Sequence, residues 1–288
     1  MSATLLATST GCCDQSQQLI DKPEFTSTDG IFNIEALEAL GRVSNPKVSP
    51  DGTKILYGIS YESVEQNKSN NELYVMNIDG SGQKRLTTTP MSENDALWID
   101  GGRRIAFIAE KDGKPQMWVM NADGSNRHVV TRMENGVGGF VVSPDGTKVV
   151  LISTVKFART AADVYPDLPK ANARIIDDLM YKHWDEWVTD IPHPFLADFD
   201  GYRVTNIKDI MQDEPYESPM KPFGGVESFA WSPDSKQLVY TSRKKTGKEY
   251  AVSTNSDLYL YDLATASTRN LTEGMMGYDT NPAFSPDG

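Results

Sequence analysis

The chain has 288 residues, 39% of them hydrophobic and 24% charged, which is the composition of a globular protein with one large domain or two ordinary ones. Its 40 acidic residues outnumber its 28 basic ones, for a formal net charge of -12, and no long Lys/Arg run is present, so nucleic acid and anionic membrane surfaces are not expected partners. No window approaches the roughly 18 to 20 consecutive apolar residues of a transmembrane helix.

Residues 1–30 are predicted to be a signal-like or disordered tail. The segment MSATLLATSTGCCDQSQQ has a short apolar stretch and then Gly11-Cys12, which resembles the end of a bacterial lipoprotein signal peptide. This resemblance implies lipidation of Cys12 and a location in the periplasm or cell envelope, or secretion. A charged segment before the apolar stretch is missing, so either Met1 lies inside a longer signal or the tail is an ordinary polar extension. Since the other cysteine is Cys13, the rest of the chain has no disulfide and no cysteine-based zinc site.

Residues 33–43, NIEALEALGRV, predict a short helix with Asn33 as its N-cap and Gly41 after its end. The next segment, VSPDGTKILY (48–57), predicts a turn and a strand, because Pro presets φ, Asp bonds back to the backbone and Gly takes a positive φ. The pattern returns as VVSPDGTKVVLIS (141–153), WSPDSKQLVYTS (231–242) and FSPDG (284–288), with a degenerate copy LWIDGGRRIAFIAE (97–110). Ser235 replaces the glycine of the other copies, so we expect a different conformation there, since a positive φ would cost about 1 kcal/mol.

The copies recur about every 50 residues, and one interval holds an insertion of about 40 more, which is the signature of a repeat fold. Each unit has a second pattern, NELYVMNIDGSGQKRLT (71–87), PQMWVMNADGSNRHVVT (115–131) or SDLYLYDLATASTRNLT (256–272), and thus four β-rich runs. The runs after the turns are apolar at nearly every position, which is typical of strands covered on both faces. Residues 31–288 are therefore predicted to be all-β, a β-propeller with four four-stranded blades and the start of a fifth, and we expect it to continue beyond Gly288.

The insertion, residues 156–194, is predicted to be a helical arm in the third blade. Its apolar side chains recur at the spacing of one helical face: Ile175, Ile176, Leu179, Met180, His183 and Trp184. Pro166 and Pro169 precede this stripe as entry signals. After the arm, residues 193–210 are predicted to supply the second half of the third blade.

The opening IEALEALGRVSNPKVSPDG, the SPDG blades and the arm YPDLPKANARIIDDLMYKHWDEW resemble the N-terminal propeller of the prolyl oligopeptidase family of serine peptidases, in its dipeptidyl and acylaminoacyl peptidase branch. The resemblance covers about residues 31–288. It implies the gating, substrate-selecting part of an exopeptidase that cleaves dipeptides or single residues from the N-terminus of short peptides. Its partners would be peptide substrates and its own C-terminal α/β-hydrolase domain with a Ser-Asp-His triad, and a homodimer of the full protein stays open.

No catalytic residue is assigned in this chain. The nucleophile elbow G-x-S-x-G does not occur, and the last histidine is His193, so no histidine follows in the order that the triad needs. This chain by itself is therefore expected to be inactive.

Dipeptidyl peptidases of this family bind the substrate's α-ammonium with acidic residues on a propeller-borne arm. The resemblance therefore points to Asp185 and Glu186 as the anchor, with Trp184 and Trp187 as aromatic walls. Two adjacent carboxylates can make charge-assisted hydrogen bonds to an ammonium group. The best known version is a Glu-Glu pair, so the match is one of residue type. The alternative is that both tryptophans pack the arm onto the blade while the carboxylates face water.

No metal or cofactor is expected. His183 and His193 have no third histidine nearby, which falls short of a usual zinc ligand set. A second function is a free-standing periplasmic propeller that serves as a protein-binding scaffold, similar to the Tol-associated propeller. This alternative explains the SPDG repeats but not the arm.

Overall fold

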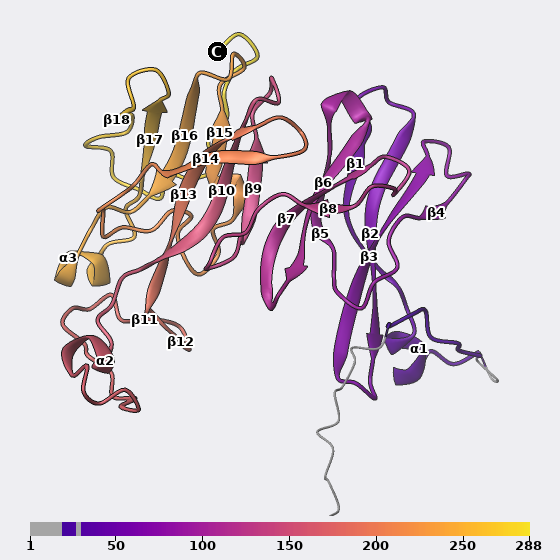
Figure 1. The fold of residues 1–288 in the computed structure, drawn as a ribbon, viewed down its shortest axis with the longest axis horizontal. Helices are drawn as coiled ribbons and strands as arrows, with labels where there is room; N and C mark the ends of the chain where they lie inside the picture. The colour runs from indigo at the N-terminus through magenta and orange to yellow at the C-terminus, as the bar shows by residue number, and fades with distance from the viewer. Residues whose placement is uncertain (1–18, 27–29) are drawn as a thin grey trace, which may run out of the picture.

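The computed structural model describes residues 19–26 and 30–288, which form four four-stranded antiparallel sheets in succession (Figure 1). Each sheet is one of the predicted blades. Blade 1 contains β1 (Arg42–Val48), β2 (Lys54–Ser63), β3 (Lys68–Asn77) and β4 (Lys84–Arg85), and blade 2 contains β5 (Asn94–Ile99), β6 (Arg104–Lys111), β7 (Lys114–Asn121) and β8 (His128–Val129). Blade 3 contains β9 (Gly139–Val142), β10 (Lys148–Lys156), β13 (Asp190–Phe199) and β14 (Val204–Asp209), and blade 4 contains β15 (Phe229–Trp231), β16 (Gln237–Ser242), β17 (Asp257–Asp262) and β18 (Ser267–Asn270).

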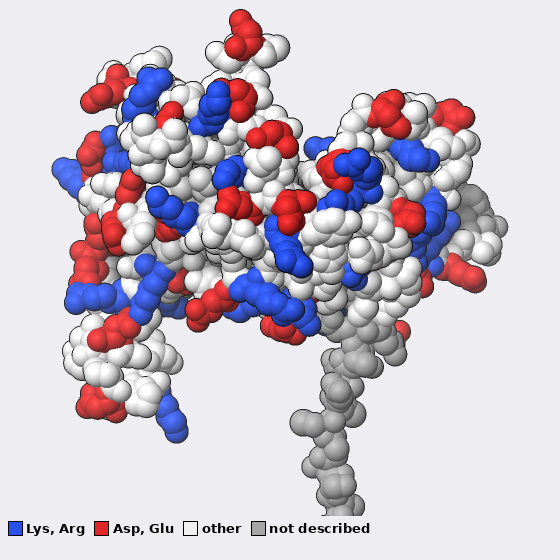
Figure 2. Space-filling model, turned by 45° about the horizontal axis from the view of Figure 1, so that its top comes forward, with Lys and Arg blue, Asp and Glu red and all other residues white. Residues whose placement is uncertain are grey.

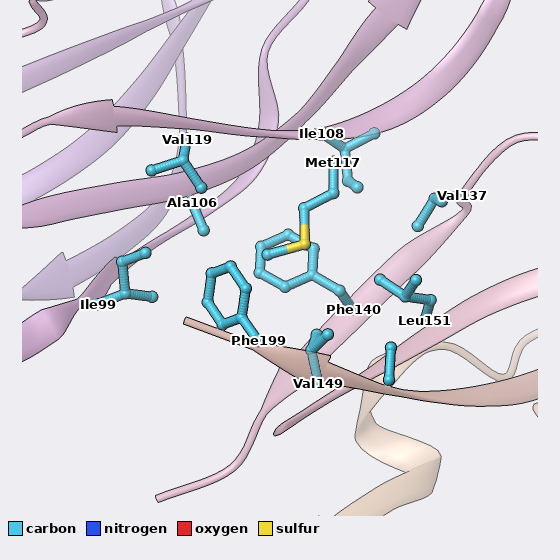
Figure 3. Packing of buried hydrophobic residues seen from close by; sticks show 11 residues of the cluster. Ile99, Ala106, Ile108, Met117, Val119, Val137, Phe140, Val149, Leu151 and Phe199 are labelled. Carbon is cyan, nitrogen blue, oxygen red and sulfur yellow. The ribbon is translucent and has the colours of Figure 1, made fainter. Parts of the chain in front are cut away.

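The blades pack face to face through the second strand of each sheet. On β10, Val149 and Leu151 join the apolar cluster shared with blade 2, shown in Figure 3, whereas Val150 and Ile152 join the cluster shared with blade 4. Successive side chains of a strand point to opposite faces, so a strand between two neighbours must be apolar at every position. The continuous apolar runs predicted such strands, and the four-stranded blades and their order are confirmed.

The Ser-Pro-Asp-Gly segment joins the first and second strands of a blade. In blade 1 the Ser49 hydroxyl donates to Asp51 Oδ1 (2.6 Å) and accepts the Lys54 backbone N–H (2.9 Å). The N–H of Gly52, at φ +72°, donates to the Ser49 carbonyl (2.8 Å). The serine hydroxyl thus closes the turn across the strand ends, and the motif is a backbone device, as predicted.

Ser235 in blade 4 keeps this turn, so the prediction of a different conformation is wrong. Its φ is +61°, and its N–H donates to the Ser232 carbonyl at 2.9 Å, as glycine does in the other copies. The Ser235 hydroxyl accepts the backbone N–H of Asp145 in the turn of blade 3 (3.1 Å). This bond between blades offsets the strain of a left-handed residue.

The short helix α1 (Ile34–Glu38) precedes blade 1, and the Asn33 side chain accepts the Ala36 N–H at 2.9 Å, which confirms the predicted N-cap. Within the described part of the chain the other helices are α2 (Ala161–Val164) and α3 (Gly247–Val252), and the 3-10 turns are η1 (Asp100–Gly102) and η2 (Val226–Ser228). Among the described residues, none of the helices is long and apolar enough to cross a membrane. The predicted lipidation site, Cys12, lies outside the described residues.

The inserted arm lies between β10 and β13 of blade 3 and projects from one end of the sheet (Figure 1). Its only α-helical turn among the described residues is α2, and the predicted helix through residues 175–184 is wrong. The arm instead ends in a hairpin of β11 (Lys182–His183) and β12 (Glu186–Trp187).

Three observations explain why the stripe does not form a helix. Of its apolar side chains, Met180 is buried, whereas Ile176 and Leu179 stay about half exposed, so an apolar face has nothing to pack on. The Asp178 carboxylate accepts the N–H of the next residue (2.6 Å), which competes with helical bonding. Trp184 has φ +50°, which a right-handed helix cannot contain.

Replacing Ser235 with alanine removes the acceptor of the Asp145 N–H while keeping a Cβ at positive φ. We therefore expect the free energy of unfolding to fall by about 1 kcal/mol. Ser235→Gly loses the same bond but relieves a strain of about 1 kcal/mol, so its stability should stay within about 0.5 kcal/mol of the wild type. Urea unfolding followed by tryptophan fluorescence measures both, and a glycine variant as unstable as the alanine variant would contradict this account.

Candidate functional site

The predicted site residues lie at the tip of the arm. Trp184 and Asp185 form the turn between β11 and β12, in which Lys182 is opposite Trp187 and His183 is opposite Glu186. Opposite residues of an antiparallel pair project to the same face. Glu186 therefore shares one face of the hairpin with His183, and Trp187 lies on the other face with Lys182.

The Trp187 ring makes cation–π contacts with two basic side chains of the arm itself. The Arg174 guanidinium lies 4.2 Å from the ring centroid and the Lys182 ammonium 5.1 Å from it. Tyr181 lies beside the same ring, with centroids 6.2 Å apart. Trp187 is thus separated from Glu186 by the hairpin backbone and already has two cationic partners.

Trp184 lies at the exposed end of the hairpin. Trp184 is 72% exposed and its ring meets that of Phe223 edge-on, with centroids 5.1 Å apart, and Phe223 is itself 73% exposed. Asp185 and Glu186 are also exposed. Since Trp187 is 42% exposed as well, the alternative is wrong in packing both tryptophans onto the blade, whereas its carboxylates do face water.

A buried polar cluster, which we call the Glu217 cluster, lies on the face of the hairpin that His183 shares with Glu186. It contains Glu217, His183, Tyr250 and Arg243. The Glu217 side chain is 1% exposed and lies 3.1 Å from His183 Nε2, and the Tyr250 hydroxyl donates to its Oε1 (3.2 Å). Arg243 is 4.0 Å from the same carboxylate and its guanidinium lies 4.0 Å from the Tyr250 ring centroid.

The hydrogen-bond donors of this cluster can be assigned because the Glu217 carboxylate is an acceptor. A carboxylate accepts but does not donate, so His183 Nε2 carries the proton that it shares with Glu217. Burial raises the pKa of Tyr250 far above its ordinary value, and the Glu217 charge raises it further, so the phenol remains a neutral donor.

The sequence did not predict this cluster. Its members come from the arm, from the segment between blades 3 and 4 and from the insertion between β16 and β17, so no local spacing links them. The one signal was His183, predicted to be a buried member of the stripe; its side chain is 12% exposed.

The two histidines that were considered as metal ligands lie in different surroundings. His193 is buried, and its Nδ1 lies 2.8 Å from Asp209 Oδ2, whereas His183 faces Glu217. Across residues 19–26 and 30–288, no group of three or more His, Cys, Asp and Glu residues could hold a metal ion.

A second buried charged cluster joins blades 1 and 2. Glu72 and Glu93 both bond to Thr89, through its N–H (2.8 Å) and its hydroxyl (2.8 Å) respectively. Arg85 lies 3.1 Å from Glu72, and Arg127 lies 2.8 Å from Glu93. Burial raises the pKa of Glu93 to about 7, although Thr89 and Arg127 act in the opposite direction. Both carboxylates are matched by an arginine, so we assign this cluster to blade packing.

The surface of the protein carries both acidic and basic side chains. In the face displayed by Figure 2, acidic and basic side chains alternate over the blades and no continuous basic surface forms.

Comparison with known proteins gives a consistent result. Residues 33–179 match the family model PD40, described as the TolB beta propeller domain. The chain is 50% identical over 263 residues to Dipeptidyl-peptidase 5 of Porphyromonas gingivalis and 44% identical over 263 residues to Dipeptidyl-peptidase 5 of Porphyromonas endodontalis. Each alignment covers 91% of this chain and 38% of the relative, so the chain spans little more than a third of these relatives.

The fold is also that of solved peptidase propellers. An acylaminoacyl peptidase in complex with Z-Gly-Gly-Phe-chloromethyl ketone superposes with a TM-score of 0.59 at 14% identity, over 82% of this chain and 33% of the peptidase. A puromycin hydrolase superposes with a TM-score of 0.50 at 13% identity, over 85% of this chain and 30% of the hydrolase. At such identities the likeness concerns the fold alone.

Because Glu93 has a pKa of about 7 when folded and an ordinary value of 4.5, folding takes up a proton at this site between those pH values. The resulting stabilisation is complete below about pH 4.5 and is lost as the pH rises through about 7. Relative to Glu93→Gln, which does not titrate, the wild type should therefore lose on the order of 2 kcal/mol between about pH 5 and pH 8. Urea unfolding across this range measures the difference.

The matched control is Asp167→Asn, which replaces an exposed carboxylate of the arm. Its stability should follow that of the wild type with pH. Parallel pH profiles for Glu93→Gln and the wild type would show that Glu93 does not titrate in this range.

Proposed function

The chain belongs to the TolB beta propeller (PD40) family, and we propose that it is the propeller portion of a longer serine exopeptidase that removes dipeptides from the N-terminus of short peptides. The observation that carries this proposal is the 50% identity to a dipeptidyl peptidase over 91% of the chain. Its partners are then peptide substrates and a C-terminal catalytic domain that supplies the nucleophile and its triad.

Within this function, Asp185 and Glu186 are proposed to bind the α-ammonium group of the substrate. Both are exposed at the end of the arm and can turn toward a ligand. Glu186 shares its hairpin face with the Glu217 cluster, while the Trp184–Phe223 pair offers an exposed apolar surface beside it. The geometry therefore favours Trp184 over Trp187 as the aromatic wall.

The alternative, a free-standing scaffold propeller, accounts for the family match but gives no role to the arm. The two functions differ in what the gene encodes after Gly288. A peptidase requires a G-x-S-x-G elbow followed by Asp and His, whereas a scaffold requires only the remaining blades.

Replacing Asp185 with Asn and Glu186 with Gln in the full-length protein removes the negative charge that pairs with the substrate ammonium. A charge-assisted hydrogen bond is worth about 1.5–3 kcal/mol, so KM for dipeptidyl substrates with a free amino group should rise about 10-fold or more. Turnover at saturation should change much less, because the ammonium is remote from the scissile bond. Steady-state kinetics with chromogenic dipeptidyl substrates measures both constants.

Asp167→Asn is again the matched control, because it removes an exposed carboxylate from the same arm. Its KM should equal that of the wild type. Unchanged KM in the Asp185/Glu186 variant would rule out this pair as the ammonium anchor.

We also propose a cell-envelope location with lipid attached at Cys12, on the basis of the Gly11-Cys12 sequence. Cys12→Ala should move the full-length protein from the membrane fraction to the soluble fraction and abolish its labelling with radioactive palmitate. Cys13→Ala, the neighbouring cysteine, is the control and should remain with the membrane. Membrane retention of the Cys12 variant would contradict the proposal.

A further inference from the structure

We propose that the Glu217 cluster is the joint that holds the arm on blade 4, and that Glu217 and Tyr250 act as positioning residues for the hairpin that carries Asp185 and Glu186. The claim that the cluster attaches the arm to blade 4 depends only on the structure. Its effect on substrate binding rests on the function proposed above.

Three separate segments meet at this joint. His183 comes from the arm, Glu217 from the segment between β14 and β15, and Tyr250 from α3 in the insertion of blade 4. The Glu217 carboxylate has one oxygen toward His183 (3.1 Å) and the other toward the Tyr250 hydroxyl (3.2 Å). A single buried carboxylate thus connects the arm to a different blade.

The buried charge of Glu217 stabilises the attached position of the arm. The Glu217 side chain is 1% exposed, and burying a carboxylate is costly unless donors surround it. The hydrogen-bonding partners are His183 and Tyr250, and the Arg243 guanidinium adds a positive charge at 4.0 Å. If the arm swung away, Glu217 would lose one of these donors while remaining buried, which opposes the motion.

A second contact lies next to the first. The Asp178 carboxylate of the arm accepts the N–H of Gly247, the first residue of α3, at 3.0 Å. Met180 and Val188 of the arm are buried against Tyr250 and against Ile191 at the start of β13. Polar and apolar contacts therefore attach the arm to the same short helix of blade 4.

The other ion pairs of the arm do not attach it to another blade. Arg159 pairs with Asp177 (2.6 Å), and Lys156 pairs with Asp163, so each pair joins two parts of the arm or its own root. These pairs are largely exposed to water and worth little. Among the described residues, the arm is thus attached to blade 4 by the joint and by the Asp178–Gly247 and apolar contacts beside it.

The joint and the candidate anchor are connected through the hairpin. His183 is opposite Glu186 in the hairpin, so a shift of His183 relative to Glu217 displaces the Glu186 carboxylate by a similar distance. Misplacement of a binding group by about 1 Å can cost a factor of about 100. The position of α3 in blade 4 is therefore expected to set where the substrate's amino end is held.

The test is Glu217→Gln in the full-length protein, which keeps the shape of the side chain and removes its charge. The segment itself stays attached through its backbone, because the Ser242 hydroxyl donates to the Glu217 carbonyl (2.9 Å) and the Ser218 N–H to the Pro192 carbonyl (2.9 Å). Hydrogen exchange read by mass spectrometry on peptides covering residues 180–189 and 245–252 reports the joint. We expect exchange at least about 10-fold faster there, because the local opening becomes easier.

Steady-state kinetics of the same variant distinguish a displaced ammonium anchor from a general loss of structure. KM for free-amino dipeptidyl substrates should rise about 5- to 10-fold with kcat within about twofold of the wild type, because the catalytic groups lie elsewhere. Tyr250→Phe keeps the ring under Arg243 and removes one donor, so it should give the same changes at smaller size.

The matched control is Glu72→Gln. Glu72 is also buried, paired with an arginine and bonded to a threonine, but it lies between blades 1 and 2. This variant should leave both arm exchange and KM unchanged even if it lowers overall stability.

The outcomes discriminate between the two levels of the proposal. Wild-type exchange in the arm of Glu217→Gln, or equal acceleration in Glu72→Gln, would overturn the joint. Faster arm exchange with unchanged KM would support the joint and overturn the positioning role of Glu217 and Tyr250, whereas KM of the Asp185/Glu186 variant tests the ammonium anchor separately.

Discussion

The structure depends on one constraint, the burial of the second strands of blades 2 and 3, β6 and β10, on both faces. Each inner strand supplies alternate side chains to two neighbouring sheets, as Ile105 and Phe107 on β6 face blade 1 while Ala106 and Ile108 face blade 3. Such a strand cannot carry a charged side chain in its centre without burying it. The blades therefore have little freedom in sequence, and functional variation is confined to the ends of the strands.

The arm follows from this constraint. Its residues are inserted where β10 ends and β13 begins, so the ladder between those strands runs unbroken from Lys148 to Lys156. The insertion between β16 and β17, which contains α3, lies at the corresponding place in blade 4. Two insertions at the same end of adjacent blades can meet, and Tyr250 and His183 do so around the buried carboxylate of Glu217. The polar joint is thus built outside the apolar stack that carries the fold.

Much of the fold was predictable from the sequence because the relevant signals are local. The Ser-Pro-Asp-Gly turn uses side chains within five residues of one another, and the apolar runs report burial position by position. The two wrong predictions, at Ser235 and at residues 175–184, concern features that depend on packing between distant segments. Ser235 keeps a strained φ because Asp145, in the preceding blade, supplies a bond, and the stripe at residues 175–184 lacks a surface on which a helix could pack.

The sequence by itself determined the number and order of the described blades, the place of the insertion and the residue types at the tip of the arm, because these depend on periodicity and turn chemistry. The tertiary structure alone decided that Glu186 and Trp187 lie on opposite faces of a hairpin. It also brought Glu217, Tyr250 and Arg243 together around His183, the residue opposite Glu186. Hairpin register and contacts between blades arise when distant segments pack, and no spacing along the chain encodes them.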